Sequence, residues 1–380
     1  MDSRIPHSQL YKDILHGIET LISSDAAFAL FRTQGAEPVL MLQKNRKGTL
    51  YTHFADVKGS GFIFSPFAEE QGHPVILFRD DHVFTGWEEI AAGVKKVIHD
   101  DSLPPSTTPH VVLCPFEELK ERLYKSPIDK GYQRAFSAIL KDLQDGRFQK
   151  LVLSRSQDIS GRFSAGRIFL NACGRYPNAM VSLVHGTCGT WVGASPEILL
   201  EGSREKGWRT MALAGTRPAG STEAWDDKNR REQNIVARYI ESVLTPFAAR
   251  LEKSEPHTYA AGSVEHLRTP LTIQPKEGAS IREIVEHLHP TPAVCGLPKE
   301  EAKRRILTTE SHDRRYYAGF QGVWNGNENC SLYVNLRCLK LSAASIRLFA
   351  GGGIMPQSAC EAEWLETCGK MCTMLSLLGK

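Results

Sequence analysis

Two acids and a lysine near residue 365 stand at a spacing that places them on one face of a helix. They are Glu363, Glu366 and Lys370, and the capping-box pattern beginning at Ser358 predicts a helix start just before them. Three glycines, residues 351–353, precede that helix and would let the backbone approach a ligand and turn N–H groups toward an anion. This combination suits a metal ion and a carboxylate substrate. The alternative is a glycine turn followed by a solvated Glu–Lys pair.

A further acid lies on the apolar face of a long predicted helix, residues 226–247. Helical spacing puts Glu232 on the same face as Val236, Tyr239 and Val243. A buried acid is costly unless a cation compensates it. Magnesium would do so, because it takes oxygen ligands from one or two carboxylates and keeps positions open for water and substrate. A salt bridge to a neighbouring arginine is the competing interpretation.

Two ionisable residues stand at the ends of apolar strands, where a general base and a general acid could act. Lys150 opens the strand KLVLSR, where burial would lower its pKa and leave it basic. Glu197 stands where a loop gives way to a strand, and burial would raise its pKa. Gly215, Thr216 and His266 lie at other strand ends and could line the same pocket. A solvated lysine, a surface acid and a structural histidine are the alternatives.

The elements that must position these residues are read from hydrophobic periodicity. Strands arrive in runs between helices, which favours an α+β fold with large antiparallel sheets packed as a sandwich and helices on the outside. A stretch rich in Pro, Ser and Thr predicts a loop at residues 101–109, and Ser126 is the predicted N-cap of a helix that Gly146 ends. The predicted strands include residues 25–32, 37–42, 59–65, 75–78, 150–155, 179–185, 190–193, 198–202, 210–214, 259–264, 331–340 and 345–350.

Composition excludes several classes of protein. The chain has 380 residues, a hydrophobic fraction of 41% and a net charge of only +3, which gives no basic footprint for nucleic acid or an anionic membrane. No stretch is long and apolar enough to span a membrane, and residues 1–6 lack the apolar core of a signal peptide. Nine cysteines without a CxxC pair favour reduced thiols. We therefore expect a cytoplasmic protein.

A series of short motifs gives the features above a definite order along the chain. They are KLVLSR, GASPEILL, ALAGTRPAG, KNRREQNIV, HPTPAVCGLP, NLRCLKL and RLFAGGGIMPQSACEAEWLET. In this order they closely resemble the chorismate-utilising enzymes and, within them, the isochorismate synthases. The resemblance covers about residues 125–378. It implies the chorismate-binding enzyme fold, with residues 125–380 as the catalytic region and residues 1–124 as a variable α/β part of the same sandwich.

The resemblance implies a role for each candidate residue. Lys150 matches the base that activates water for attack at ring carbon 2, and Glu197 matches the acid that protonates the departing 4-hydroxyl. Glu232 and Glu363 match the two magnesium ligands, and Glu366 matches a further acid of the metal shell that acts through water. The residues expected around the substrate are Gly215, Thr216, His266, Arg337, Gly351, Gly353, Glu366 and Lys370.

The implied activity is the magnesium-dependent conversion of chorismate to isochorismate by a monomeric isomerase that serves menaquinone or siderophore synthesis. A salicylate synthase, which uses the same acid and base and then eliminates pyruvate, is the closest alternative, and a chorismate-binding protein without activity is another. Enzymes that aminate chorismate carry no lysine where Lys150 stands, and those of the aminodeoxychorismate type place a nucleophilic lysine where this chain has Ala214. The loop HPTPAVCG, residues 289–296, is more similar to the isochorismate type.

Overall fold

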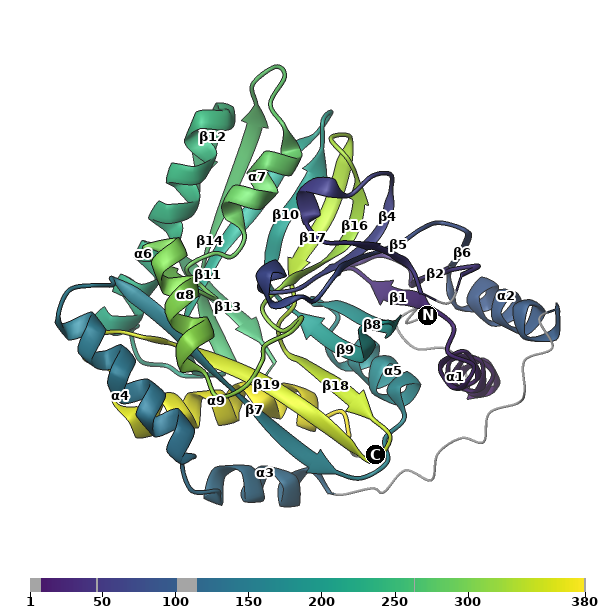
Figure 1. Ribbon diagram of the computed structural model, residues 1–380, viewed down its shortest axis with the longest axis horizontal. Coiled ribbons are helices and arrows are strands. Elements are labelled where there is room, and N and C mark those ends of the chain that lie inside the picture. The colour runs from purple at the N-terminus through teal and green to yellow at the C-terminus, as the bar shows by residue number, and fades with distance from the viewer. Residues whose placement is uncertain (1–7, 46, 101–114, 263, 379–380) are drawn as a thin grey trace.

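Two large antiparallel sheets form the protein, and helices lie around them (Figure 1). The computed structural model describes residues 8–45, 47–100, 115–262 and 264–378, and the predicted loop at residues 101–109 lies outside these ranges. Strands are joined into sheets by antiparallel pairing throughout the described part of the chain, as in the 10-residue ladder between residues 345–354 and 151–160. The predicted α+β architecture is confirmed.

The first sheet has nine strands in the described part of the chain. In spatial order they are β15 (Gly296–Leu297), β7 (Lys150–Ser160), β19 (Ser345–Ile354), β18 (Cys338–Ser342), β9 (Gly189–Ser195), β8 (Met180–Gly186), β1 (Phe28–Arg32), β2 (Val39–Leu42) and β6 (His82–Thr85).

The second sheet has ten described strands. In spatial order they are β12 (Ala248–Lys253), β14 (Val264–Pro275), β11 (Gly207–Pro218), β10 (Ile198–Ser203), β17 (Asn329–Val334), β16 (Phe320–Asn325), β4 (Gly61–Ser65), β5 (Val75–Phe78) and β3 (Thr49–Tyr51), with β13 (His257–Ala261) paired to β14.

Helices occupy the outside of both sheets. None of those described is long and apolar enough to cross a membrane. The α-helices are α1 (Ser8–Ser23), α2 (Trp87–Asp100), α3 (Phe116–Lys125), α4 (Lys130–Gln144), α5 (Ala165–Arg175), α6 (Asp227–Leu244), α7 (Ile281–Leu288), α8 (Lys299–Thr309) and α9 (Cys360–Leu375), and the short 3-10 helices are η1 (Phe54–Asp56), η2 (Glu69–Gln71) and η3 (Thr245–Phe247).

The start of helix α4 differs from the prediction. Its N-cap is Asp129, whose carboxylate accepts a hydrogen bond from the Tyr132 amide at 2.9 Å. Ser126 instead ends α3, where its hydroxyl donates to the Arg122 carbonyl at 2.6 Å. Both serine and aspartate are favourable N-cap residues. Because Ser126 lies at the C-terminal end of α3, Asp129 is the residue that caps α4.

The core between the sheets is made of aromatic and aliphatic side chains from both. Phe31 on β1 packs on Phe62 of β4 with ring centroids 4.8 Å apart, and Phe64 of β4 meets Trp191 of β9 edge-on at 6.1 Å. All four are buried, and burying each such side chain contributes about 1.5–3 kcal/mol or more. The apolar side chains of the predicted strands thus pack the two sheets against each other.

Two of the points where the chain crosses between the sheets are neighbours in space. The β9–β10 crossing carries Glu197, and the β17–β18 crossing carries Arg337. The predicted single strand at residues 331–340 is therefore wrong. It divides into β17 and β18 in different sheets, and Arg337 adopts a positive φ of 46° where the chain changes direction. Two polar side chains are thereby carried into the space between the sheets.

Residues 1–124 contribute strands to both sheets. In the described part of this region, β1 pairs with β8 and β4 pairs with β16, so both sheets continue across residue 124. The division into residues 1–124 and 125–380 stays a prediction.

Candidate active site

The β9–β10 and β17–β18 crossings are tied together by hydrogen bonds and form the floor of the site. The Ala194 amide donates to the Arg337 carbonyl at 2.9 Å, and the Val334 amide donates to the Glu197 carbonyl at 3.0 Å. These bonds fix the backbone that carries Glu197 and Arg337. Both side chains therefore belong to one rigid unit between the sheets.

A cavity of about 50 Å³ lies above this floor. It brings together many of the predicted site residues, whereas Lys150, Glu363 and Glu366 are not part of its lining. The predicted residues that line it are Glu197, Gly215, Thr216, Glu232, His266, Arg337, Gly351, Gly353 and Lys370, and other lining residues are Val152, Pro196, Leu213, Tyr317 and Phe349.

Glu197 is a buried carboxyl group at the wall of this cavity. The residue is 2% exposed and forms no ion pair with any described residue. Burial raises the pKa of Glu197 to about 8, although the positive charges of Lys150, Lys370 and Arg337 oppose the shift. The upward shift expected from burial is confirmed. A carboxyl group with this pKa holds its proton at neutral pH and can donate it.

Lys150 is fully buried and lies behind the cavity wall. It is 0% exposed, and its Nζ is 2.9 Å from Oε1 of Glu232 in an ion pair. The contact lacks the angles of a good hydrogen bond. The salt bridge considered for Glu232 thus exists, but its partner is this lysine from β7 rather than a neighbouring arginine. The role of Lys150 as a base stays a prediction.

The triple glycine, residues 351–353, lies inside strand β19 rather than in a turn. Gly352 pairs with Leu153 and Gly353 with Val152 of β7, so the strand does not end at residue 350 as predicted, and the alternative of a glycine turn ahead of the helix is wrong. A Cβ on Gly353 would overlap the Glu232 carboxylate and lie 2.6 Å from Cε of Lys150. A Cβ on Gly352 would lie 3.1 Å from Oε2 of Glu363. These glycines leave room for the charged side chains that cross the strand.

Helix α9 places Glu363, Glu366 and Lys370 against β19. Lys370 donates to the Gly351 carbonyl at 2.8 Å and pairs with Glu366 at 2.7 Å. Burial and the nearby Glu366 raise the pKa of Glu363. Burial also acts upward on Glu366, but the charge of Lys370 outweighs it and lowers the pKa. The face predicted from the i, i+3 and i+7 spacing therefore lies against the sheet, with Glu363 buried and Glu366 and Lys370 partly buried.

The predicted capping box at the start of α9 is wrong. The N-cap is Ala359, and no side chain caps it. Ser358 instead donates its hydroxyl hydrogen to Oε1 of Glu363 at 2.6 Å and accepts from the Met355 amide at 3.0 Å. This serine therefore positions a site carboxylate instead of a helix end.

Lys228 is a site residue that the sequence interpretation missed. Its Nζ is 2.5 Å from Oε1 of Glu363, and that carboxylate raises the pKa of Lys228 although burial opposes the shift. Its position four residues before Glu232 on α6 was the available signal, since residues at this spacing share a helix face.

The three carboxylates Glu232, Glu363 and Glu366 suit a hard divalent cation. Gly352 faces both Glu363 and Glu366, and Gly353 faces Glu232, so the acids gather along one strand. Oε2 of Glu363 is buried without a hydrogen-bond partner. Among the described residues, no group of three acids, histidines or cysteines is already gathered tightly enough to hold a metal. Each acid is instead paired with a lysine, so these pairs and a cation are alternatives for the same oxygens.

Arg337 is a buried cation without a carboxylate partner. It is 7% exposed, and no described residue forms an ion pair with it. Its guanidinium donates to Nε2 of His266 at 2.7 Å and to Oγ1 of Thr373 at 3.3 Å. Burial lowers the pKa of Arg337 to about 10, so it stays charged at neutral pH. A buried charge of this kind calls for an anionic ligand.

His266 orients Arg337. Because a guanidinium can only donate, Nε2 of His266 accepts from it, and Nδ1 carries the proton and donates to the Gly215 carbonyl at 2.8 Å. Burial, with the charges of Arg337 and Lys370, holds the pKa of His266 well below its usual value. Gly215 and Thr216 form a bulge inside β11 rather than the predicted strand end, and the Thr216 amide donates to Oδ1 of Asn229 at 3.0 Å. The histidine is thus neutral and fixed in one orientation.

The chain belongs to the family of chorismate binding enzymes, whose sequence pattern it matches over residues 86–379. It is 32% identical over 246 residues to isochorismate synthase EntC of Escherichia coli (strain K12), covering 60% of this chain and 62% of the relative. It is 31% identical over 267 residues to isochorismate synthase MenF of Bacillus subtilis (strain 168), covering 66% of this chain and 56% of the relative. The chain therefore spans about three fifths of the length of these relatives.

A solved structure shares the fold. The menaquinone-specific isochorismate synthase MenF from Escherichia coli superimposes with a TM-score of 0.73 at 23% identity, over 95% of this chain and 91% of that one. The similarity extends over both sheets, including the N-terminal strands.

Proposed function

We propose that this protein is an isochorismate synthase, an isomerase that converts chorismate to isochorismate. The observation that carries the proposal is a buried, proton-holding Glu197 on a cavity that is also lined by Lys370 and by Arg337, which has no ion-pair partner among the described residues. Chorismate is a dianion with a hydroxyl leaving group, so it needs cations for its carboxylates and an acid for the departing oxygen. The names of the relatives above support the same activity.

The proposed reaction adds water at ring carbon 2 and expels the hydroxyl at carbon 4. For this step Lys150 must first leave its ion pair with Glu232 and give up its ammonium proton to solvent. As a neutral amine it then takes a proton from the attacking water, whose oxygen bonds to carbon 2, and the ring double bonds shift. The C4–O bond breaks as Glu197 gives its proton to the leaving hydroxyl, which departs as water. One water enters and one leaves, so the product is an isomer of the substrate.

The substrate carboxylates would bind to Arg337, Lys370 and the backbone around Gly215, Thr216, Gly351 and Gly353. His266 would contribute by holding the guanidinium of Arg337 in place. Because the cavity measures only about 50 Å³, its walls must move apart to admit a substituted ring. The pairs of Lys150 with Glu232 and of Lys370 with Glu366 are the contacts that can open.

Magnesium is the proposed cofactor, held by Glu232 and Glu363 directly and by Glu366 through water. When bound, it would offset charge on the ring carboxylate. The buried and unpartnered Oε2 of Glu363 supports this assignment. We further propose that the product serves menaquinone or siderophore synthesis in the cytoplasm.

Product analysis tests this proposal. Purified protein is incubated with chorismate and magnesium, and the products are separated by chromatography and identified by mass. We expect isochorismate alone, and its loss when EDTA is added. Salicylate with pyruvate would instead make the protein a lyase that uses the same site. Unchanged chorismate would reject the catalytic proposal.

A further inference from the structure

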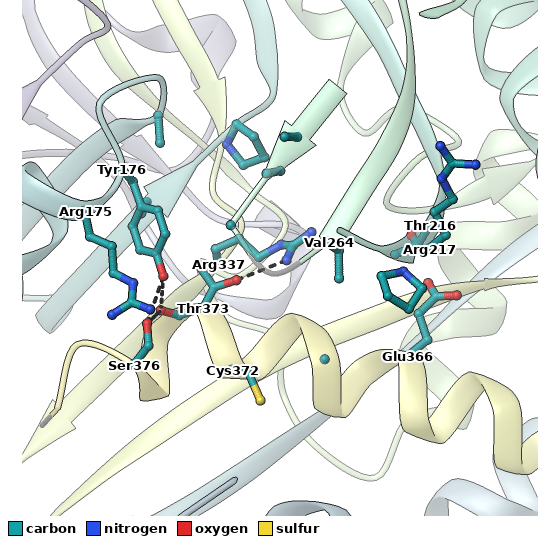
Figure 2. Close-up of a pocket in the computed structure, with 18 of the residues that line it drawn as sticks. Arg175, Tyr176, Thr216, Arg217, Val264, Arg337, Glu366, Cys372, Thr373 and Ser376 are labelled. Carbon is teal, nitrogen blue, oxygen red and sulfur yellow. Dashed lines mark hydrogen bonds between the residues drawn. The ribbon is translucent and has the colours of Figure 1, made fainter. Parts of the chain in front are cut away.

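A second and larger hollow lies beside the proposed active site. It measures about 890 Å³ and opens between helices α3 and α9 and strands β13 and β14 (Figure 2). Pro196, Thr216 and Arg337 line both this hollow and the small cavity. The two spaces thus share a wall made of residues from the sheet crossing and the β11 bulge.

The charges around this hollow are mostly positive. Lys120, Arg175, Arg217 and Arg337 line it, against one lining carboxylate, Glu366. The field of clustered cations in a concave surface raises the local concentration of anions and their rate of association. The hollow is therefore suited to attract a small dicarboxylate toward the inner cavity.

Arg175 is the rim cation whose charge is available to a ligand. Lys120 pairs with Glu117 at 3.7 Å, and Arg217 pairs with Glu265 at 3.0 Å. Arg175 is exposed and forms no ion pair with any described residue. Its positive charge is thus uncompensated at the mouth of the hollow.

Hydrogen bonds connect the rim to the buried arginine. The Tyr176 hydroxyl, which contacts the Arg175 side chain, donates to the Thr373 carbonyl at 2.8 Å, and Oγ1 of Thr373 is 3.3 Å from Nη1 of Arg337 (Figure 2). Arg175 and Arg337 therefore stand at the outer and inner ends of one polar wall. An anion that moves inward along this wall would leave the guanidinium of Arg175 and bind that of Arg337.

We propose that this hollow is the access vestibule of the active site and that Arg175 captures the carboxylates of the incoming substrate. The inference rests on the proposed function, since it takes chorismate as the ligand. It assigns Arg175 a role in substrate capture, outside the chemical step. The consequence is a salt-sensitive contribution to kcat/KM with little effect on kcat.

The test compares Arg175→Gln and Arg175→Glu with the wild-type enzyme in steady-state turnover of chorismate. At low ionic strength we expect kcat/KM to fall by roughly threefold in R175Q and tenfold in R175E, as the Coulomb attraction of the dianion is removed and then reversed. We expect kcat to stay near the wild-type value, and the difference to shrink at high salt. Arg250→Glu, the same charge change on exposed strand β12, is the matched control and should have a much smaller effect.

A steric variant tests the path independently of charge. Ala260 lines the hollow on β13, and Ala260→Trp would narrow it without touching the inner cavity. We expect a lower kcat/KM with an unchanged kcat. Wild-type kcat/KM in both R175E and A260W would overturn the vestibule, as would a loss in R175E that does not change with salt. A wild-type enzyme that does not convert chorismate would overturn the proposed function itself.

Discussion

Two buried arginines in this protein differ in what surrounds them. Arg314 is 1% exposed, and its Nη2 and Nε donate to the two carboxylate oxygens of Glu310 at 2.6 and 2.8 Å. It also donates to the carbonyls of Val294 and Val152 at 2.7 and 3.0 Å. Its charge and its hydrogen-bond donors are thus satisfied within the protein.

Arg337 is nearly as buried but has a neutral histidine and a threonine hydroxyl as partners. The difference teaches how a structural charge is told from a functional one. The Glu310 carboxylate opposite Arg314 completes a cluster that holds separate segments of the chain together. Arg337 has no such carboxylate, and under the proposed function the substrate supplies it. Glu197 is likewise a buried ionisable group without an ion-pair partner among the described residues, although burial keeps it protonated at neutral pH.

The largest expected effect is on kcat, when Glu197 can no longer act as an acid. Glu197→Gln keeps the size of the side chain but cannot donate a proton to the leaving hydroxyl. We expect kcat to fall by roughly 10²- to 10⁴-fold, with a melting temperature close to that of the wild type. Steady-state kinetics and thermal unfolding measure both quantities.

Glu310→Gln is the matched control from the satisfied cluster. It should lower the melting temperature, because it removes the charge that compensates Arg314, yet the folded fraction should keep a kcat near wild type. Equal losses of activity in E197Q and E310Q would break the comparison.

The next effect is on stability and concerns Arg314. Arg314→Met removes the guanidinium and leaves the buried Glu310 without the cation that pairs with it, although the Ser154 amide still donates to Oε1 of Glu310 at 2.7 Å. We expect the free energy of unfolding to fall by about 3–5 kcal/mol. Denaturant titration followed by tryptophan fluorescence provides the measurement. A variant as stable as the wild type would show that the cluster is not structural.

Arg337→Met should affect activity more than stability, the reverse of Arg314→Met. The loss of a charged hydrogen bond to a substrate carboxylate should weaken binding by about 1.5–3 kcal/mol, or roughly 10- to 150-fold in kcat/KM. The free energy of unfolding should change far less than in R314M, because no carboxylate is left unpaired. If R337M is destabilised as much as R314M while kcat/KM is unchanged, Arg337 is a structural residue.

The smallest effect is the pH dependence of the site. Because the pKa of Glu197 is raised to about 8, its protonated form prevails below that pH and is lost above it. We expect kcat/KM to decline as the pH rises through about 8 and to be about tenfold below its low-pH plateau one unit above that pKa. A decline that E197Q retains unchanged would assign this titration to another group.

The sequence predicted the burial of several site residues better than the course of the backbone around them. Lys150 and Glu197 at strand starts, and Glu232 on an apolar helix face, are local patterns that hydrophobic periodicity reveals. The structure buries all three, as those patterns required. Whether a segment forms a helix or a strand could be predicted for the same reason, because this choice depends largely on neighbouring residues along the chain.

What the sequence could not predict depends on contacts between distant segments. The triple glycine has the composition of a turn, and only the side chains of Lys150, Glu232 and Glu363, reaching across β19, explain it as part of a strand. The apolar run through residues 331–340 continues without a break in pattern, and the positive φ of Arg337 that divides it is a property of the fold. The lysine partner of Glu363 likewise comes from another helix.

The most direct test of the account is ligand binding to the incomplete cluster, measured as stabilisation. E197Q, which should bind chorismate without consuming it, is heated with magnesium and increasing chorismate, and R337M in the E197Q background is its control. The account predicts a saturable rise in the melting temperature of E197Q, roughly 3 °C at 100 times the dissociation constant, and a much smaller rise at the same concentrations in the double variant. No rise in E197Q, or an equal rise in both, would contradict the claim that a substrate carboxylate completes the site around Arg337.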